Sequence, residues 1–259
     1  MTKVLMLGDS SHLNTGYSSL NKNLLSRFQE TGYITAELAY YGHVDSPHKS
    51  NIPWIYFGNL PGRHNQPASQ EEDNSYNGDP LNQFGKWRFE ETCLALKPDV
   101  VVTYVDHWMA SYVLYSPFRR YFKTVFVPTV DAKSQSEQWI YDYMGLDHCY
   151  TYTDFAYKTL QEESGGLIPL KGVAPPGVNN RIFCPVHDKK QHKANVGIDP
   201  NSLIVGTVMR NQKRKLFPDL LPAFAKFLEN CKGKNEELAN RTYLFLHTSY
   251  PDFGWDIPK

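Results

Sequence analysis

The sequence predicts an α/β protein in which a parallel sheet carries helices on both faces and a second, smaller domain follows. From residue 4 to residue 163, short and nearly continuous apolar segments alternate with segments of helical periodicity. This alternation is typical of parallel sheets that are covered on both sides. It breaks at the turn-forming segment 174–180 and the polar segment 184–201, and then resumes. We therefore expect two domains, 1–184 and 185–259.

The elements of the first domain follow from their periodicity. Leu20, Leu24 and Phe28 recur at helical spacing after the first apolar segment, and Gly32 marks the end of that helix. The segment 58–85 is rich in Asn, Gln, Gly, Pro and acidic residues, which predicts a long mobile loop. The predicted strands are 4–7, 34–40, 52–57, 99–104, 124–127 and 149–153, and the predicted helices are 17–30, 86–96, 108–115, 136–143 and 154–163.

The second domain repeats the alternation but is short. A strand is predicted at 203–209, a loop at 211–215, a helix at 217–230 and a further strand at 243–247. An open α/β sheet ordinarily needs about four or more strands to bury its faces. We therefore expect this sequence to be a fragment that covers only the opening part of the domain.

Charge and hydropathy exclude several classes of protein. Lys plus Arg and Asp plus Glu number 27 each, so the net charge is zero with neutral histidines. Proteins that coat nucleic acids carry a basic excess, so no nucleic-acid partner is expected. The mean hydropathy is −0.50, and no apolar run approaches the ~18 residues that a membrane span requires.

The cysteines and histidines show no metal-binding or disulfide pattern. The four cysteines include no CxxC pair, and the nine histidines include no HExxH motif. Isolated thiols of this kind suit the reducing environment of the cytoplasm. We therefore expect a cytoplasmic protein without a metal site.

Polar loops follow three predicted strands of the first domain. Ligands gather at such positions because the carboxyl ends of parallel strands meet the N-termini of helices. Gly16 ends the loop after the first strand and leaves room for a phosphate or a sugar near the backbone. His107 and Asp131 each follow a later strand, and a histidine exchanges protons near neutral pH. A turn, a helix cap or a satisfied polar residue also explains each of them, so both interpretations stay open.

The segment 208–215, Val-Met-Arg-Asn-Gln-Lys-Arg-Lys, is the most informative. Four cations directly follow a buried strand and precede an apolar helix, which directs Arg210 and Lys215 at an anion near the edge of the sheet. Arginine grips phosphate oxygens through two bonds, and lysine supplies a point charge. A solvated charged face is an equally good interpretation of the residues alone. No DxD motif occurs, which argues against a metal-bridged nucleotide-sugar site.

Together these segments resemble glycosyltransferase family 4, whose members are retaining enzymes of the GT-B fold with the signatures P-x-G-V-D…F-x-P and G-x-x-x-R…K. The segment 175–179, Pro-Pro-Gly-Val-Asn, followed by Phe183 and Pro185, is similar to the first signature. It departs from the family at Asn179, where Asp is usual, and at Pro176, where Asn or His is usual.

The second signature is matched by Gly206, Arg210 and Lys215. The resemblance implies two Rossmann-like domains, the first for the acceptor and the second for a nucleotide-diphosphate sugar. It also implies that Arg210 and Lys215 neutralise the diphosphate leaving group in place of a metal, so that no cofactor is needed. Asp131 falls near the position where many relatives carry a histidine beside the donor sugar. With His107 it forms our catalytic prediction, and Gly16 joins the basic pair as a predicted binding residue.

Two functions remain open at this point. The first is a glycosyltransferase whose acceptor is a saccharide, a lipid or a small molecule. The second is a non-catalytic α/β binding module, or a shortened remnant of such an enzyme. The family's Glu-x7-Glu segment, which holds the donor, is expected beyond residue 259, so we expect the sequence alone to be inactive.

Overall fold

The computed structural model describes residues 1–257, which form two compact units. Met1–Val178 make up the first unit, and the second begins at Asn179. The division falls ahead of the boundary after residue 184 that the sequence predicts. No helix within residues 1–257 has the length and apolar character needed to cross a membrane.

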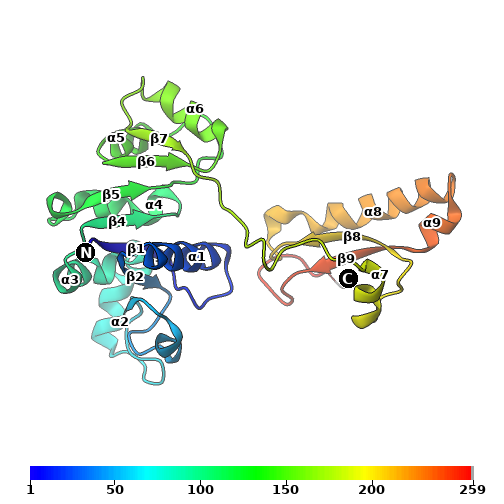
Figure 1. Cartoon of the computed structure of the whole chain (residues 1–259), viewed down its shortest axis with the longest axis horizontal. Coiled ribbons are helices and arrows are strands. Elements are labelled where there is room, and N and C mark those ends of the chain that lie inside the picture. The colour runs from blue at the N-terminus through cyan, green and yellow to red at the C-terminus, as the bar shows by residue number, and fades with distance from the viewer. Residues whose placement is uncertain (258–259) are drawn as a thin grey trace. The chain divides into compact units, whose positions relative to one another are not determined.

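A parallel sheet of seven described strands forms the centre of the first unit (Figure 1). The strands are β1 (Lys3–Asp9), β2 (Ile34–Tyr40), β3 (Ile55–Gly58), β4 (Val100–Thr103), β5 (Lys123–Phe126), β6 (His148–Thr151) and β7 (Leu170–Val173). They lie in the order β3-β2-β1-β4-β5-β6-β7, and each neighbouring pair is parallel. The predicted α/β class is confirmed. Strands are added outward from β1 to β3 and then outward from β4 to β7, so the strand order reverses between β1 and β4.

Helices cover both faces of this sheet, as predicted. Neighbouring residues of a strand point to opposite faces, and accordingly Leu5 and Met6 of β1 lie in separate clusters of buried residues. Leu5 lies in a cluster with Phe89 and Leu160, and Met6 in a cluster with Leu25. The helices are α1 (Gly16–Glu30), α2 (Gln70–Asn77), α3 (Lys86–Leu96), α4 (His107–Ala110), α5 (Glu137–Met144) and α6 (Asp154–Glu163), with the 3₁₀ turns η1 (Pro47–Asn51), η2 (Pro80–Phe84), η3 (Ser111–Tyr115) and η4 (Arg119–Tyr121).

The prediction of a long loop over residues 58–85 is wrong, because α2 and η2 lie within it. Ser69 caps α2 by accepting a hydrogen bond from the backbone N–H of Glu72 at 3.2 Å. Asp79 caps η2 in the same way, with the N–H of Leu81 at 2.8 Å. These side-chain caps stabilise two short helices whose composition resembles that of a loop.

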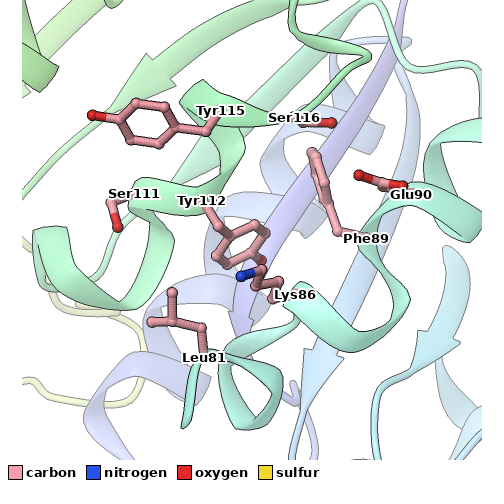
Figure 2. Close-up of a pocket in the computed structure, with 8 residues that line it drawn as sticks. All are labelled: Leu81, Lys86, Phe89, Glu90, Ser111, Tyr112, Tyr115 and Ser116. Carbon is pink, nitrogen blue, oxygen red and sulfur yellow. The ribbon is translucent and has the colours of Figure 1, made fainter. Parts of the chain in front are cut away.

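A pocket of about 400 Å³ lies among η2, α3 and η3 (Figure 2). Its residues are Leu81, Lys86, Phe89, Glu90, Ser111, Tyr112, Tyr115 and Ser116. Phe89 and Tyr112 are buried, whereas Lys86 and Glu90 are exposed, so the pocket combines an aromatic floor with a charged rim. The ammonium group of Lys86 is paired with Asp79 at 2.6 Å.

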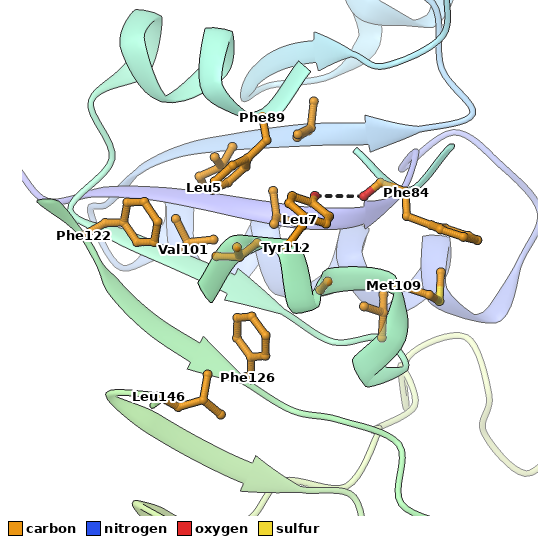
Figure 3. Packing of buried hydrophobic residues seen from close by; sticks show 14 of the residues in the cluster. Leu5, Leu7, Phe84, Phe89, Val101, Met109, Tyr112, Phe122, Phe126 and Leu146 are labelled. Atoms are coloured by element: carbon orange, nitrogen blue, oxygen red, sulfur yellow. Dashed lines mark hydrogen bonds between the residues drawn. The ribbon is translucent and has the colours of Figure 1, made fainter. Parts of the chain in front are cut away.

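The larger cluster of buried residues joins these elements to the sheet (Figure 3). The ring of Phe89 packs edge-on against Tyr112 and Phe122, with centroids 5.4 and 5.9 Å apart. Such pairs are worth about 0.5–1.5 kcal/mol beyond the area they bury. The Tyr112 hydroxyl donates to the Phe84 carbonyl oxygen at 2.8 Å, so this buried polar group is satisfied. The core therefore fixes η2 to η3.

The second unit has a parallel pair of described strands, β8 (Leu203–Val208) and β9 (Thr242–His247). The other elements are α7 (Lys189–Asn195), η5 (Lys213–Lys215), α8 (Phe217–Lys232) and α9 (Glu236–Asn240). The strands and α8 lie where the sequence predicts them. The expectation that the strand before the basic loop is buried is wrong within the described residues, because four of the six residues of β8 are exposed and none is buried. Helix α7 lies in a segment described above only as polar, and Asp188 caps it by accepting from the N–H of Gln191 at 2.9 Å.

Candidate functional site

The carboxyl end of β1 lies where the strand order reverses, which is where open α/β sheets bind their ligands. Asp9 ends β1, and Thr15 is the N-cap of α1. The Thr15 hydroxyl donates to Asp9 Oδ2 at 2.6 Å and accepts from the N–H of Ser18 at 3.0 Å. Burial raises the pKa of the Asp9 carboxyl, and the hydrogen bond from Thr15 opposes that rise. The loop after β1 is therefore tied to both the strand and the helix.

Gly16 is the first residue of α1, at the helix N-terminus that the sequence predicts. It is exposed, and a Cβ added there would meet no atom within 4 Å. Gly8 differs, because a Cβ there would lie 2.1 Å from Nδ2 of Asn21, which donates to the Asp9 carbonyl oxygen. Close packing therefore explains why position 8 is a glycine. No such packing surrounds Gly16, which faces open space.

Loss of the cap on α1 should have a modest cost. We expect Thr15→Ala to lower the free energy of unfolding by about 1 kcal/mol, because the N–H of Ser18 loses its acceptor. Urea denaturation measures the change, and Ser19→Ala, at an exposed neighbouring position of α1, should stay within about 0.5 kcal/mol. Thr15→Ser keeps the hydroxyl, so equal losses in Thr15→Ser and Thr15→Ala would show that the cap contributes nothing.

Tyr17 brings the loops after three strands together. Its hydroxyl lies 3.3 Å from Oδ1 of Asp106, which follows β4, and 3.3 Å from Oγ1 of Thr129, which follows β5. Burial is the main cause that raises the pKa of Tyr17, with Asp106 and Asp9 acting in the same direction. Tyr17 is not among the site residues predicted from the sequence. A hydroxyl-bearing side chain in the first turn of a helix after a polar loop was the available signal.

His107 lies below the surface. It is the first residue of α4 and 2% exposed, and its Nε2 lies 2.8 Å from Oδ2 of Asp142 on α5. Asp142 also accepts from the Tyr115 hydroxyl and from Nε2 of Gln138 at 2.9 Å. Burial lowers the pKa of His107, and Asp142 opposes this shift. The Nδ1 atom is buried and has no hydrogen-bond partner among the described residues.

Asp131, the other predicted catalytic residue, lies two residues after Thr129 in the sequence and is exposed. The structure thus brings Gly16, Tyr17 and Asp106 to one edge of the sheet. His107, the residue after Asp106, is buried, and Asp131 is exposed. None of these residues lines the pocket of Figure 2. The structure does not test the catalytic roles of His107 and Asp131, which stay predictions.

The basic loop of the second unit begins directly after β8. Arg210 is exposed, and its Nε and Nη2 atoms donate to the two carboxylate oxygens of Asp252 at 2.8 and 3.0 Å. Lys213, Arg214 and Lys215 form η5, immediately before α8. Lys215 is half-buried, and no ion pair of its side chain is found within residues 1–257. In the same residues, no group of three or more His, Cys, Asp or Glu is placed to hold a metal ion.

The segment 249–256 folds back onto this loop, a contact that is not predicted from the sequence. Asn211 is fully buried, and its side-chain amide exchanges two hydrogen bonds with the backbone of Trp255, at 2.7 and 2.9 Å. The indole N–H of Trp255 donates to the Lys213 carbonyl oxygen at 3.0 Å. The signal in the sequence was a turn-forming segment with Pro and Gly after a strand, which carries an acid, Asp252, and an aromatic residue, Trp255. We call residues 249–256 the hook.

Several solved structures have a similar fold. Anabaena Alr3699/HepE, solved in complex with UDP and glucose, has 14% identity and a TM-score of 0.53, with 96% of this chain and 70% of that chain covered. Trehalose-6-phosphate synthase OtsA has 13% identity and a TM-score of 0.59, with 98% of this chain and 66% of that chain covered. The fold is of the GT-B type.

The UDP-GlcNAc 2-epimerase from Methanocaldococcus jannaschii is also similar, with 12% identity, a TM-score of 0.56 and coverage of 95% of this chain and 65% of that chain. The chain thus spans 65–70% of the length of these three GT-B-like proteins. No protein-family model matches the sequence. No curated protein matches it either.

Proposed function

We propose that the chain provides the acceptor domain and the first part of the donor domain of a glycosyltransferase. In this proposal, a sugar moves from a nucleotide-diphosphate donor to an acceptor with retention of configuration and without a metal ion. The observation that carries the proposal is Arg210, an exposed guanidinium directly after β8 in a loop with three further cations. The GT-B fold supports it, because structures of similar fold are described with UDP and glucose.

The basic loop suits a diphosphate leaving group. When the bond between sugar and phosphate breaks, negative charge accumulates on the diphosphate, and fixed positive groups stabilise that charge. A guanidinium binds phosphate oxygens through paired N–H donors, and an ammonium group adds a point charge. Arg210 and Lys215 supply one of each, so the leaving group needs no metal ion.

The edge of the sheet at β1, β4 and β5 is the proposed acceptor side. The open space at Gly16 and the hydroxyl of Tyr17 beside Asp106 offer backbone, hydroxyl and carboxylate groups of the kind that bind sugar hydroxyls. Asp131, an exposed residue that follows β5, is the proposed acid on this side. His107 would contribute by anchoring the start of α4, next to Asp106, through its bond to Asp142.

Nucleotide binding tests the proposal. We expect Arg210→Ala to weaken the binding of UDP and of inorganic pyrophosphate about tenfold, since one charge-assisted pair is lost. Titration calorimetry with EDTA present, and again with Mg²⁺, should give the same affinity for the unmodified chain. Arg214→Ala removes the same charge from an exposed position of the same loop and serves as the control, with a smaller effect expected.

Two results would contradict the proposal: no binding of either probe by the unmodified chain, or equal effects of Arg210→Ala and Arg214→Ala. The alternative function, a non-catalytic binding module, also predicts binding. It differs in predicting that no sugar is transferred from UDP-glucose by the full-length protein. Release of UDP in the presence of candidate saccharide, lipid and small-molecule acceptors separates the two functions.

A further inference from the structure

The pairing of Arg210 with Asp252 leaves part of the guanidinium free. A guanidinium carries five N–H donors, one on Nε and two on each terminal nitrogen. Asp252 accepts from Nε and Nη2, at 2.8 and 3.0 Å. Within residues 1–257 no other acceptor is found for the two donors of Nη1 and the second donor of Nη2. One donor from each of these two nitrogens forms the end-on fork that matches a phosphate.

The carboxylate of Asp252 is itself held in place. Oδ2 accepts from the Ser249 hydroxyl at 2.5 Å, and Oδ1 accepts from the N–H of Phe253 at 2.8 Å. Together with the two bonds from Arg210, four donors converge on this one carboxylate. Arg210 holds the pKa of the Asp252 carboxyl well below its ordinary range, and Ser249 and Phe253 act in the same direction.

Exposure divides the pair into a shielded partner and an open one. The side chain of Asp252 is 7% exposed, whereas that of Arg210 is 59% exposed. The hook that carries Asp252 is tied to the loop that carries Arg210 by the bonds between Asn211 and Trp255. An anion from solvent therefore meets the guanidinium and not the carboxylate.

We propose that Asp252 is a positioning residue that orients Arg210 for a diphosphate. A free arginine side chain has many rotamers, and fixing it in the binding geometry costs free energy at the moment of binding. The hook fixes it in advance, with the end-on fork directed outward. This inference rests on the proposed function, because it assigns the diphosphate of a nucleotide to that fork.

A competing role for Asp252 predicts the opposite sign. If the carboxylate occupied the place of the phosphate, its removal would free Arg210 and tighten anion binding. The side-on geometry argues against that role, since the end-on fork is left open. The sign of the change in affinity therefore decides between the two roles.

The test is the affinity for UDP and pyrophosphate of Asp252→Ala and Asp252→Asn, measured by titration calorimetry on the full chain. We expect Asp252→Ala to bind about fivefold to tenfold more weakly, although it removes a negative charge near the ligand. Asp252→Asn keeps the shape of the side chain. Its affinity should therefore lie between that of the unmodified chain and that of Asp252→Ala. Asp219→Asn removes a charge from the first turn of α8 without touching Arg210, and should bind as well as the unmodified chain or better.

A double-mutant cycle separates positioning from a general structural effect. In the Arg210→Ala background, Asp252→Ala should cause no further loss, because the residue it positions is gone. Additive losses in this cycle, or tighter binding by Asp252→Ala, would overturn the positioning role. If Arg210→Ala itself leaves the affinity unchanged, the proposed function fails as well. If Arg210→Ala weakens binding and both Asp252 variants do not, only the positioning role fails.

Discussion

Under the proposed function, replacing Lys215 by alanine is expected to lower the turnover of sugar transfer about 100-fold. A charge that stabilises a developing phosphate anion typically contributes about 3 kcal/mol to the transition state. Lys215 is half-buried at the end of η5, directly before α8, whose N-terminus adds a positive dipole end. A lysine that was only solvated would affect stability by less than about 0.5 kcal/mol and leave the rate unchanged.

The measurement is the rate of UDP release from UDP-glucose by the full-length protein, for the unmodified protein and for Lys215→Ala. Lys213→Ala is the matched control, because Lys213 is an exposed lysine in the same turn. EDTA should leave the rate of the unmodified protein unchanged. Equal rates for Lys215→Ala and Lys213→Ala would contradict a specific role of Lys215 in sugar transfer. A rate that falls with EDTA and is restored by Mn²⁺ or Mg²⁺ would contradict the proposal that transfer needs no metal ion.

The parallel sheet could be predicted because its central strands β1, β2 and β4 are buried on both faces and therefore read as short apolar runs. The six strands β1 to β6 all lie within or overlap the predicted segments. β7 was missed, since Gly172 interrupts its apolar pattern and the segment leads into the Pro- and Gly-containing turn. Its pairing with β6 also contains a register irregularity. Tertiary pairing, rather than local pattern, makes this segment a strand.

The missed helices α2 and α7 share one cause. Both are polar on all sides, so hydrophobic periodicity gives no signal for them. Both begin with a capping pattern, Ser69 with Glu72 and Asp188 with Gln191, in which the first side chain accepts from the backbone N–H of the second residue. That spacing is visible in the sequence and was the signal to use.

The residues at strand ends could be placed from sequence, but their partners could not. Gly16 and Arg210 occupy the predicted positions because each directly follows a recognisable strand or loop. The partners Asp252 of Arg210 and Asp142 of His107 lie 42 and 35 residues away in sequence. Such pairs form only when separate elements pack, and no periodicity or spacing encodes them. The burial of His107 has the same origin.

Replacing Asp142 by alanine is expected to lower the free energy of unfolding by about 3–4 kcal/mol, because it removes the acceptor of a buried network. Asp142 is 5% exposed and accepts from His107, Tyr115 and Gln138. Without it, neither ring nitrogen of the buried His107 has a partner among the described residues. Urea denaturation at pH 7.5 measures the loss. Gln138→Ala removes one donor at an exposed position and should cost less than about 1 kcal/mol.

The same network sets a dependence of stability on pH, whose sign follows from burial. The pKa of His107 is lowered in the folded protein, so the fold favours the neutral ring. Stability is therefore complete above the ordinary histidine pKa of about 6.5 and falls as the pH drops from there toward the lower folded value. Asp142→Asn removes the carboxylate that opposes the shift, so the pKa of His107 in the folded variant should be lower still. The stability of the variant should therefore keep falling down to a more acidic pH than that of the unmodified protein. Burial also lowers the pKa of His12, but both proteins share that residue, so it does not contribute to their difference. Parallel stability curves between pH 7.5 and 4.5 would show that Asp142 does not interact with the charge of His107.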